Sequence, residues 1–191
     1  MRIVKVIPLA LLFLLGCGPG PEEAVKYNDS IVVFQNRVIS MEDRFMESLD
    51  GGPEEMRQGL DSLMHQVMRS LEGTKKLGGF HGDESLYQAA VKLLENYKSI
   101  VDNEYRTVVE LLCKPDEDTE EDDQEKYDDA INEANRKLIE ATEAFDRAQD
   151  AFSKKHNFTF NPDKIVEKKT LSAFLLYFFS VFCFLILYGR N

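Results

Sequence analysis

The sequence predicts an all-α protein: an up-and-down antiparallel four-helix bundle with an N-terminal signal peptide and a C-terminal apolar helix. Three observations lead to this class. Apolar residues recur at spacings of three and four along most of the chain, which lines one face of an α-helix. No segment shows the period of two that is typical of a strand. With 11 glycines and 6 prolines in 191 residues, the chain has few turn formers and a length that suits one core.

The first two predicted helices are amphipathic and are separated by Gly51 and Gly52. Pro53 suits the first position of the second helix, which fades near Gly78 and Gly79. Short connections make neighbouring helices antiparallel. The apolar face of the first helix consists of Tyr27, Ile31, Phe34, Val38, Met41, Phe45 and Leu49, and that of the second of Met56, Leu60, Leu63, Val67 and Leu71.

The third predicted helix follows Asp83, a candidate N-cap, and ends before Pro115. Its apolar face consists of Leu86, Ala90, Leu93, Tyr97, Val101, Tyr105, Val108 and Leu112. The fourth has the most regular heptad pattern, typical of a coiled coil: Tyr127, Ile131, Ala134, Leu138, Ala141, Phe145, Ala148 and Phe152. The tyrosines on these faces are expected to be core residues with hydrated hydroxyl groups.

The N-terminus reads as an export signal. Arg2 and Lys5 precede an apolar run that is too short to span a membrane. The run ends in Leu-Leu-Gly-Cys at residues 14–17, which resembles the lipobox of bacterial lipoproteins. The resemblance implies that residues 1–16 are a lipoprotein signal peptide, that the Cys17 thiol receives a diacylglycerol, and that the new N-terminus is acylated, for example with palmitate. The alternative is a general secretory signal in which Cys17 is incidental.

We expect residues 17–22, rich in Gly and Pro, to be a tether to a bundle of residues 23–160. A linker, residues 161–170, then leads to residues 171–188, which carry no charge. As a helix this segment reaches about 27 Å, enough to cross a bilayer. It is either a transmembrane helix or an apolar tail foreign to the domain, such as the product of a shifted reading frame.

The flanking charges complicate the transmembrane interpretation. Lys164, Lys168 and Lys169 precede the apolar segment and only Arg190 follows it. If the N-terminus is exported, the three lysines lie outside, against the positive-inside bias. A third interpretation places the domain in the cytosol with a tail anchor and dismisses the signal peptide.

Two further segments resemble a group of small helical bacterial surface lipoproteins of unassigned biochemical function. These segments are Ala24 to Val32 and Ala148 to Phe158, and the resemblance covers about residues 24–160. It implies a helical domain on a lipid anchor. Members of that group stop soon after the segment that contains Lys154 and Lys155 here, so residues 171–188 depart from the pattern and favour a foreign tail.

Patterns for metal binding are incomplete. Carboxylate bundles hold two metals through Glu-x-x-His pairs, but the residues three before His65, His81 and His156 are Ser, Gly and Ser. Between residues 116 and 129, ten of fourteen residues are acidic. This run starts like an EF-hand loop, but Glu121 stands where Gly is needed and Tyr127 where the closing Glu is needed.

A structural role explains the acidic run more simply. Thr119 is a candidate N-cap of the fourth helix, with Asp122 at its third position, and acidic side chains favour a helix N-terminus. No Gly-x-Ser-x-Gly turn presents a nucleophile, and Cys113 and Cys183 are predicted to be free thiols. We therefore expect no catalytic residue, no metal and no cofactor.

The charge narrows the partner classes. A net charge of −11 without a basic run argues against nucleic acid. We expect a lipid-anchored protein of the bacterial cell envelope, facing the periplasm or the exterior, that binds an unidentified protein or envelope partner. It contacts the membrane through the lipid on Cys17, with residues 171–188 as a second candidate contact. It is not expected to be an enzyme.

Two other classes stay open. One is an integral membrane protein anchored by its C-terminal helix, as a subunit of a membrane complex. The other is an enzyme or metal-dependent module whose site is assembled only by the fold, which a cluster of buried, converging polar groups would favour.

Overall fold

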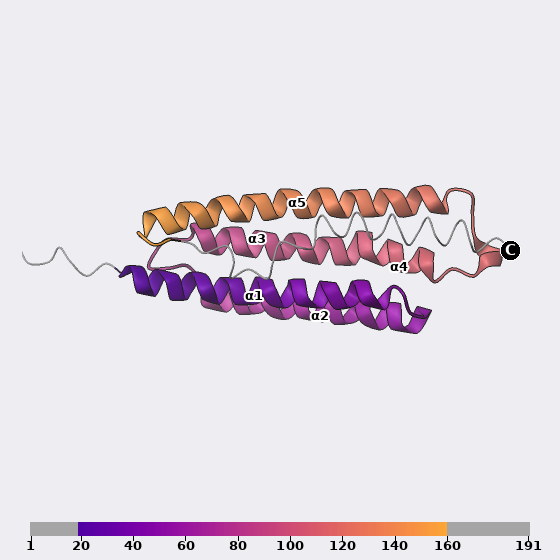
Figure 1. Ribbon diagram of the computed structural model, residues 1–191, viewed down its shortest axis with the longest axis horizontal. Helices are drawn as coiled ribbons and strands as arrows, with labels where there is room; N and C mark the ends of the chain where they lie inside the picture. Colours follow the sequence, from indigo (N-terminus) through magenta and orange to yellow (C-terminus); the bar gives the residue numbers. More distant parts are fainter. Residues whose placement is uncertain (1–18, 160–191) are drawn as a thin grey trace, which may run out of the picture.

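The computed structural model describes residues 19–159. The predicted signal peptide, Cys17, the linker and residues 171–188 lie outside the described residues. Within residues 19–159 the chain is helical and contains no strand, and four helical rods pack against one another (Figure 1). The predicted all-α class and helical bundle are therefore confirmed. None of the helices in this range has the length and hydropathy needed to cross a membrane.

The third rod consists of two helices joined by a π-helical turn, and a short 3-10 turn precedes the last rod (Figure 1). In chain order the elements are α1 (Pro21–Ser48), α2 (Pro53–Leu77), α3 (Ser85–Ile100), the π turn (Val101–Tyr105), α4 (Arg106–Leu112), the 3-10 turn (Asp116–Asp118) and α5 (Asp123–Lys155).

Local signals set most helix ends. Pro21 and Pro53 start α1 and α2, at a position where the missing N–H breaks no helical hydrogen bond. Gly78 ends α2 with φ of 68°, a conformation that glycine adopts without strain from a Cβ atom. Because Pro21 and Glu22 already belong to α1, the helix begins two residues before the predicted start of the bundle, within the segment that was predicted to be a tether.

The start of α5 differs from the prediction. Thr119 is not its N-cap, because Asp122 holds that position and Asp123 is the first helical residue. The Asp123 carboxylate accepts a hydrogen bond from the Glu120 backbone N–H at 2.9 Å and another from Lys114 Nζ at 2.7 Å. The Asp123 carboxylate at the start of α5 is therefore bound both by a nearby backbone N–H and by Lys114, which follows α4.

The antiparallel pair α1 and α2 packs closely. The Ser70 hydroxyl donates to the Phe34 carbonyl at 3.0 Å, and a Cβ atom on Gly73 would collide with the Phe34 ring. Near the other end of this helix pair, a Cβ atom on Gly59 would collide with the Ser48 side chain. Glycine at these two positions of α2 lets the backbones approach.

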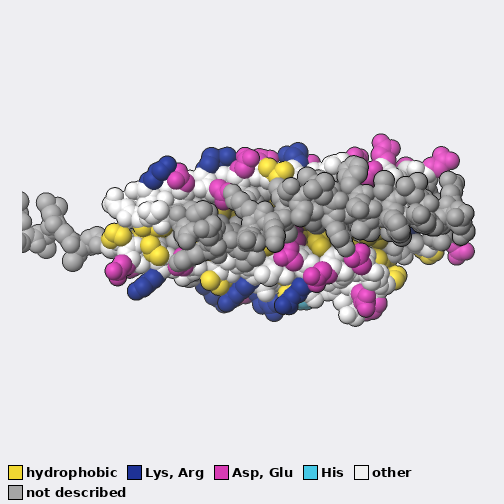
Figure 2. Space-filling model, in the orientation of Figure 1, with side chains coloured by type: hydrophobic (Ala, Val, Ile, Leu, Met, Phe, Trp, Pro, Cys, Tyr) yellow, Lys and Arg dark blue, Asp and Glu magenta, His cyan; other side chains and the backbone are white. Residues whose placement is uncertain are grey.

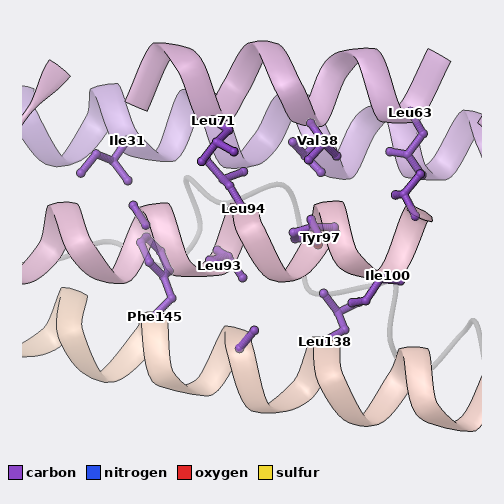
Figure 3. Packing of buried hydrophobic residues seen from close by; sticks show 14 of the residues in the cluster. Ile31, Val38, Leu63, Leu71, Leu93, Leu94, Tyr97, Ile100, Leu138 and Phe145 are labelled. Carbon is purple, nitrogen blue, oxygen red and sulfur yellow. The ribbon is translucent and has the colours of Figure 1, made fainter. Parts of the chain in front are cut away.

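One apolar core runs through the bundle (Figure 3). Val38, Leu63, Leu93, Ile100 and Phe145 come from all four rods, point toward one another and are at most 2% exposed. The predicted apolar faces are thus confirmed: every residue assigned to them is buried except the half-buried Phe34, Met41, Leu49, Leu112, Ile131 and Ala148.

Candidate functional sites in the helical bundle

The predicted anchor, Cys17, lies outside the described residues, so its lipidation stays a prediction. Cys113 is a free, half-buried thiol at the end of α4. Its Sγ lies 3.7 Å from the Pro53 carbonyl oxygen and 3.9 Å from Met56 Sδ. This thiol packs against the start of α2.

The histidines are placed separately from the acidic run. His65 is exposed on α2, His81 Nε2 lies 2.7 Å from Glu23 Oε1, and His156 Nε2 lies 2.9 Å from Asp83 Oδ2. None of them belongs to the one group of metal-type side chains found among residues 19–159.

That group consists of Glu120, Asp122 and Asp123, whose carboxylate oxygens lie within 4.8 Å of one another. Lys126 Nζ lies 3.1 Å from Glu120 Oε2 and 2.9 Å from Asp122 Oδ1, and Lys114 Nζ lies 2.7 Å from Asp123 Oδ2. Hydrogen bonds from the Glu120 backbone and from Lys114 hold the pKa of the Asp123 carboxyl below its usual range. Each of the three carboxylates therefore already lies against one of two ammonium groups at the start of α5.

A buried carboxyl group lies between α1 and the third rod. Tyr105 donates its hydroxyl hydrogen to Glu42 Oε1 at 2.6 Å, and Tyr97 donates to Glu42 Oε2 at 3.4 Å. Glu42 is 9% exposed, and the two tyrosines are 4% exposed or less. The tyrosine hydroxyls are thus not hydrated as the sequence predicted; they bind a carboxyl group that sequence reasoning missed.

Burial dominates the electrostatics of this cluster. It raises the pKa of Glu42 from 4.5 to about 7; the adjacent Asp43 carboxylate adds to the rise, and the hydrogen bonds from Tyr105 and Tyr97 oppose it. Burial and the neighbouring Glu42 raise the pKa values of both tyrosines well above 10.0. The three groups satisfy one another, because both hydroxyl hydrogens are used on the one carboxyl group.

The π turn brings the two tyrosines to the same face. Eight residues separate Tyr97 from Tyr105, and on a regular α-helix they would point about 80° apart. The π turn at Val101–Tyr105 takes up one additional residue, which reduces the difference to about 20°. Both hydroxyls can then reach Glu42.

Glu42 is the last of three buried polar residues that recur every seventh position on α1. The other two are Asn28 and Gln35, and all three are at most 9% exposed. Gln149 of α5, which is fully buried, donates from Nε2 to Asn28 Oδ1 at 2.8 Å. Such buried polar residues fix the register of packed helices at some cost in stability. In the sequence, the signal for these three polar residues was that they recur every seventh position beside the apolar residues of the same helix.

Asp83 joins the α2–α3 connection to the end of α5. Its Oδ2 atom lies 2.9 Å from both Lys155 Nζ and His156 Nε2, and its Oδ1 accepts hydrogen bonds from the Ser85 hydroxyl and backbone N–H. Burial alone would raise the pKa of Asp83, but these hydrogen bonds hold it well below the usual range. The N-cap of α3 is Glu84 and not the predicted Asp83. Asp83 lies one residue earlier, where it accepts hydrogen bonds from the first helical residue, Ser85, and ties two distant segments together.

A groove follows the outer side of α1. Its volume is about 370 Å³. Arg37, Ser40 and Arg44 are exposed there, and Met41 is half-buried. Gln66 of α2 completes one wall, and the remaining lining residues are Val33 and Asn36.

The arginines of α1 and α2 differ from those of α4 and α5 in having no acidic partner among the described residues. Arg106, Arg136 and Arg147, on α4 and α5, each lie 3.5 Å or less from an acidic side chain. Within residues 19–159, the arginines of α1 and α2 have no acidic side chain within 4.0 Å: these are Arg37, Arg44, Arg57 and Arg69.

The contacts of these α1 and α2 arginines are with uncharged groups. The Arg37 guanidinium stacks 5.7 Å from the centre of the Phe34 ring, and Arg69 donates to Gln66 Oε1 at 3.1 Å. Figure 2 shows Lys and Arg side chains along both long edges of the molecule, with Asp and Glu side chains among them. Within the described part of the chain, these four guanidinium groups therefore lack a carboxylate partner, although the protein is acidic.

Comparison of the chain with protein-family models, with curated proteins and with solved structures finds no match in any of the three. The function is therefore inferred from the sites described above and from the sequence.

Proposed function

We propose that this protein is a lipid-anchored protein of the bacterial cell envelope and that its helical bundle is a binding module. The observation that carries the binding role is the groove on α1. There Arg37 and Arg44 are exposed without acidic partners among residues 19–159, on a chain with a net charge of −11. Guanidinium groups of this kind are suited to bind an anionic group from outside.

The position of α1 supports the combination of an anchor and a binding module. The helix begins at Pro21, four residues after Cys17, so the tether spans at most about 14 Å. Val33, the first lining residue of the groove, lies 12 residues into α1, about 18 Å along the helix axis. A lipid on Cys17 would therefore hold the base of the bundle near the membrane, and an upright bundle would keep the groove clear of it.

The proposal also includes the direction of the helices and the start of the mature chain. The mature protein would be an up-and-down bundle that starts at the lipid-modified Cys17 after removal of residues 1–16. Residues 171–188 are a second candidate membrane contact. The buried Glu42 cluster does not favour an enzyme over a binding module, because its three groups are hydrogen-bonded to one another and none of them lines the groove.

Detergent phase separation tests the anchor. We expect Cys17→Ser to abolish lipidation, because the acyl transfer needs the thiol. With residues 171–188 also deleted, the protein should move from the detergent phase to the aqueous phase. Cys113→Ser is the matched control and should stay in the detergent phase, because that thiol is half-buried against α2.

The mass of the mature N-terminal peptide gives an independent readout of cleavage before Cys17 and of acylation. If the Cys17→Ser protein that also lacks residues 171–188 stays in the detergent phase, the lipid anchor is refuted. If a protein that keeps Cys17 leaves the detergent phase when residues 171–188 are deleted, the integral membrane alternative replaces our proposal.

A further inference from the structure

We propose that the groove on α1 binds an acidic α-helix of a partner protein, with two carboxylate side chains seven residues apart that pair with Arg37 and Arg44. This inference rests on the binding-module function proposed above and names the chemistry of the partner. Arg37 and Arg44 both line the groove, and both are exposed.

The spacing of the two arginines selects a helix as the occupant. Seven residues on α1 correspond to about 10.5 Å along its axis and to nearly two full turns, so the two side chains point in similar directions. Acidic residues at positions i and i+7 of a helix lying along α1 repeat this spacing and direction. In an extended peptide, residues about 10 Å apart are three positions apart and point to opposite sides.

The chemistry of the groove also matches an amphipathic helix. Met41, half-buried between the two arginines, and Val33, 45% exposed, supply apolar surface. A partner helix that carries apolar residues at i+3 and i+4 would cover Met41 while its acidic residues reach the guanidinium groups. Asn36, Ser40 and Gln66 supply polar atoms at the walls.

The charges favour recognition of an acidic group by direct contact at the groove, because the net charge of the protein does not attract anions from a distance. The chain as a whole repels anions, with 34 acidic residues against 23 lysines and arginines. The arginines at the groove form no ion pair within residues 19–159, so no salt bridge of the described bundle has to break when a carboxylate arrives. Planar guanidinium groups also bind carboxylates through two parallel hydrogen bonds.

A lipid headgroup fits the groove less well. The groove begins about 18 Å from the end of α1 that follows the tether and extends farther from it. An upright bundle on a tether of four residues would keep Arg44 beyond the reach of membrane phosphates. The partner is therefore expected among proteins that stand on, or approach, the same membrane surface.

The test measures fluorescence anisotropy of labelled helical peptides with the full-length protein in non-ionic detergent micelles. The probe, the acidic-pair peptide, has 18 residues of alanine and glutamine with glutamate at its positions 6 and 13 and leucine at its positions 9 and 10. One control peptide carries glutamine in place of both glutamates. A second control carries its glutamates at positions 6 and 11, which places the two carboxylates on different sides of the helix.

Matched protein variants assign the binding to the groove. We expect Arg37→Gln combined with Arg44→Gln to weaken binding of the acidic-pair peptide by about tenfold. Arg57→Gln, which removes an arginine outside the groove lining, and Arg147→Gln on α5 should leave binding within about twofold. Circular dichroism checks that each variant keeps its helices. Raising the salt concentration from about 0.05 M to 0.5 M should weaken binding of the acidic-pair peptide.

Several results would overturn the proposal. These are failure of the acidic-pair peptide to bind at about 1 mM, equal binding of either control peptide, and equal loss with Arg57→Gln. Competition by phosphatidylglycerol vesicles with the same dependence on Arg37 and Arg44 would assign the groove to lipid. A dimer by light scattering that the double variant dissociates would assign it to a second copy of the chain. Because these measurements use no lipidation readout, their failure is distinct from failure of the anchor at Cys17.

Discussion

The buried carboxyl group of Glu42 should make the stability of the bundle depend on pH near neutrality. In the unfolded chain the carboxyl titrates near 4.5, and in the folded protein burial raises its pKa to about 7. Below pH 4.5 the group is neutral in both states. As the pH rises through 4.5 and then through 7, the unfolded chain gives up the proton first, so the free energy of unfolding falls.

The difference between 4.5 and about 7, at about 1.36 kcal/mol for each pKa unit, corresponds to about 3 kcal/mol. This loss is complete above about pH 8. Glu42→Gln removes the titration and keeps an amide oxygen that can accept the Tyr105 hydroxyl hydrogen. We therefore expect the variant to be about 3 kcal/mol more stable relative to the wild type at pH 8 than at pH 4.5.

Urea unfolding of the polypeptide of residues 19–159, followed by circular dichroism at 222 nm between pH 4.5 and 8.5, measures this difference. A change of about 3 kcal/mol corresponds to a shift of about 1 to 3 M in the urea midpoint. The difference between variant and wild type cancels the other titrating groups. Glu47→Gln is the matched control: Glu47 is exposed on the same helix, and its variant should follow the wild type across the pH range.

Parallel pH profiles for the wild type and Glu42→Gln would refute the reasoning, because they would mean that Glu42 has the same pKa in the folded and unfolded states. A Glu47→Gln profile that diverges as strongly as that of Glu42→Gln would mean that the effect is a general response to lost negative charge. In the first case the carboxyl group would not be buried between α1 and the third rod, and in the second the pH dependence could not be assigned to Glu42.

Leu138→Asp should destabilise the bundle by about 3 to 5 kcal/mol in thermal or urea unfolding, because it buries a carboxylate at a position that is 8% exposed; Ile139→Asp, 39% exposed, is its control and should stay within about 1 kcal/mol of the wild type. Equal effects would contradict the helix phase. The polypeptide of residues 19–159 should be strongly helical and should melt cooperatively. If it aggregates while the full chain in detergent melts cooperatively, the remaining residues pack into the domain. Asp83→Asn should cost about 1 to 2 kcal/mol at pH 7. Below about pH 4 the difference from the wild type should shrink, because the unfolded chain takes up the Asp83 proton while the folded protein still holds the carboxylate ionised. A constant difference from pH 7 to pH 2, measured by urea midpoints, would exclude the ionised form as the cause.

Helix faces and most helix ends could be predicted from the sequence because they depend on neighbours within one or two turns. Pro53 starts α2 and Gly78 ends it at the predicted places, through a missing N–H and a positive φ that act locally. The seven-residue pattern placed Leu138 and Phe145 correctly in the core. It missed Gln149, which is buried where Ala148 was expected, because an apolar pattern passes over polar residues at core positions.

The polar sites required the tertiary structure. Glu42 reads as one more surface charge until α1 packs on the third rod, where the π turn aligns Tyr97 and Tyr105 with it. No periodicity rule anticipates that turn, since it adds a residue within an otherwise regular helix. The roles of Lys114 at the start of α5 and of Lys155 at Asp83 likewise depend on segments that meet only in the fold.

The sequence by itself determined that the protein is helical, which faces of its helices are apolar, and that Cys17 is the candidate anchor, because these are properties of short stretches of chain. Only the tertiary structure decided which charges of distant segments meet. Lys114 pairs with Asp123 and Lys155 pairs with Asp83, whereas Arg37 and Arg44 meet no carboxylate of another helix among residues 19–159. Ion pairing depends on distances of a few ångströms between side chains, and a one-dimensional pattern does not contain those distances.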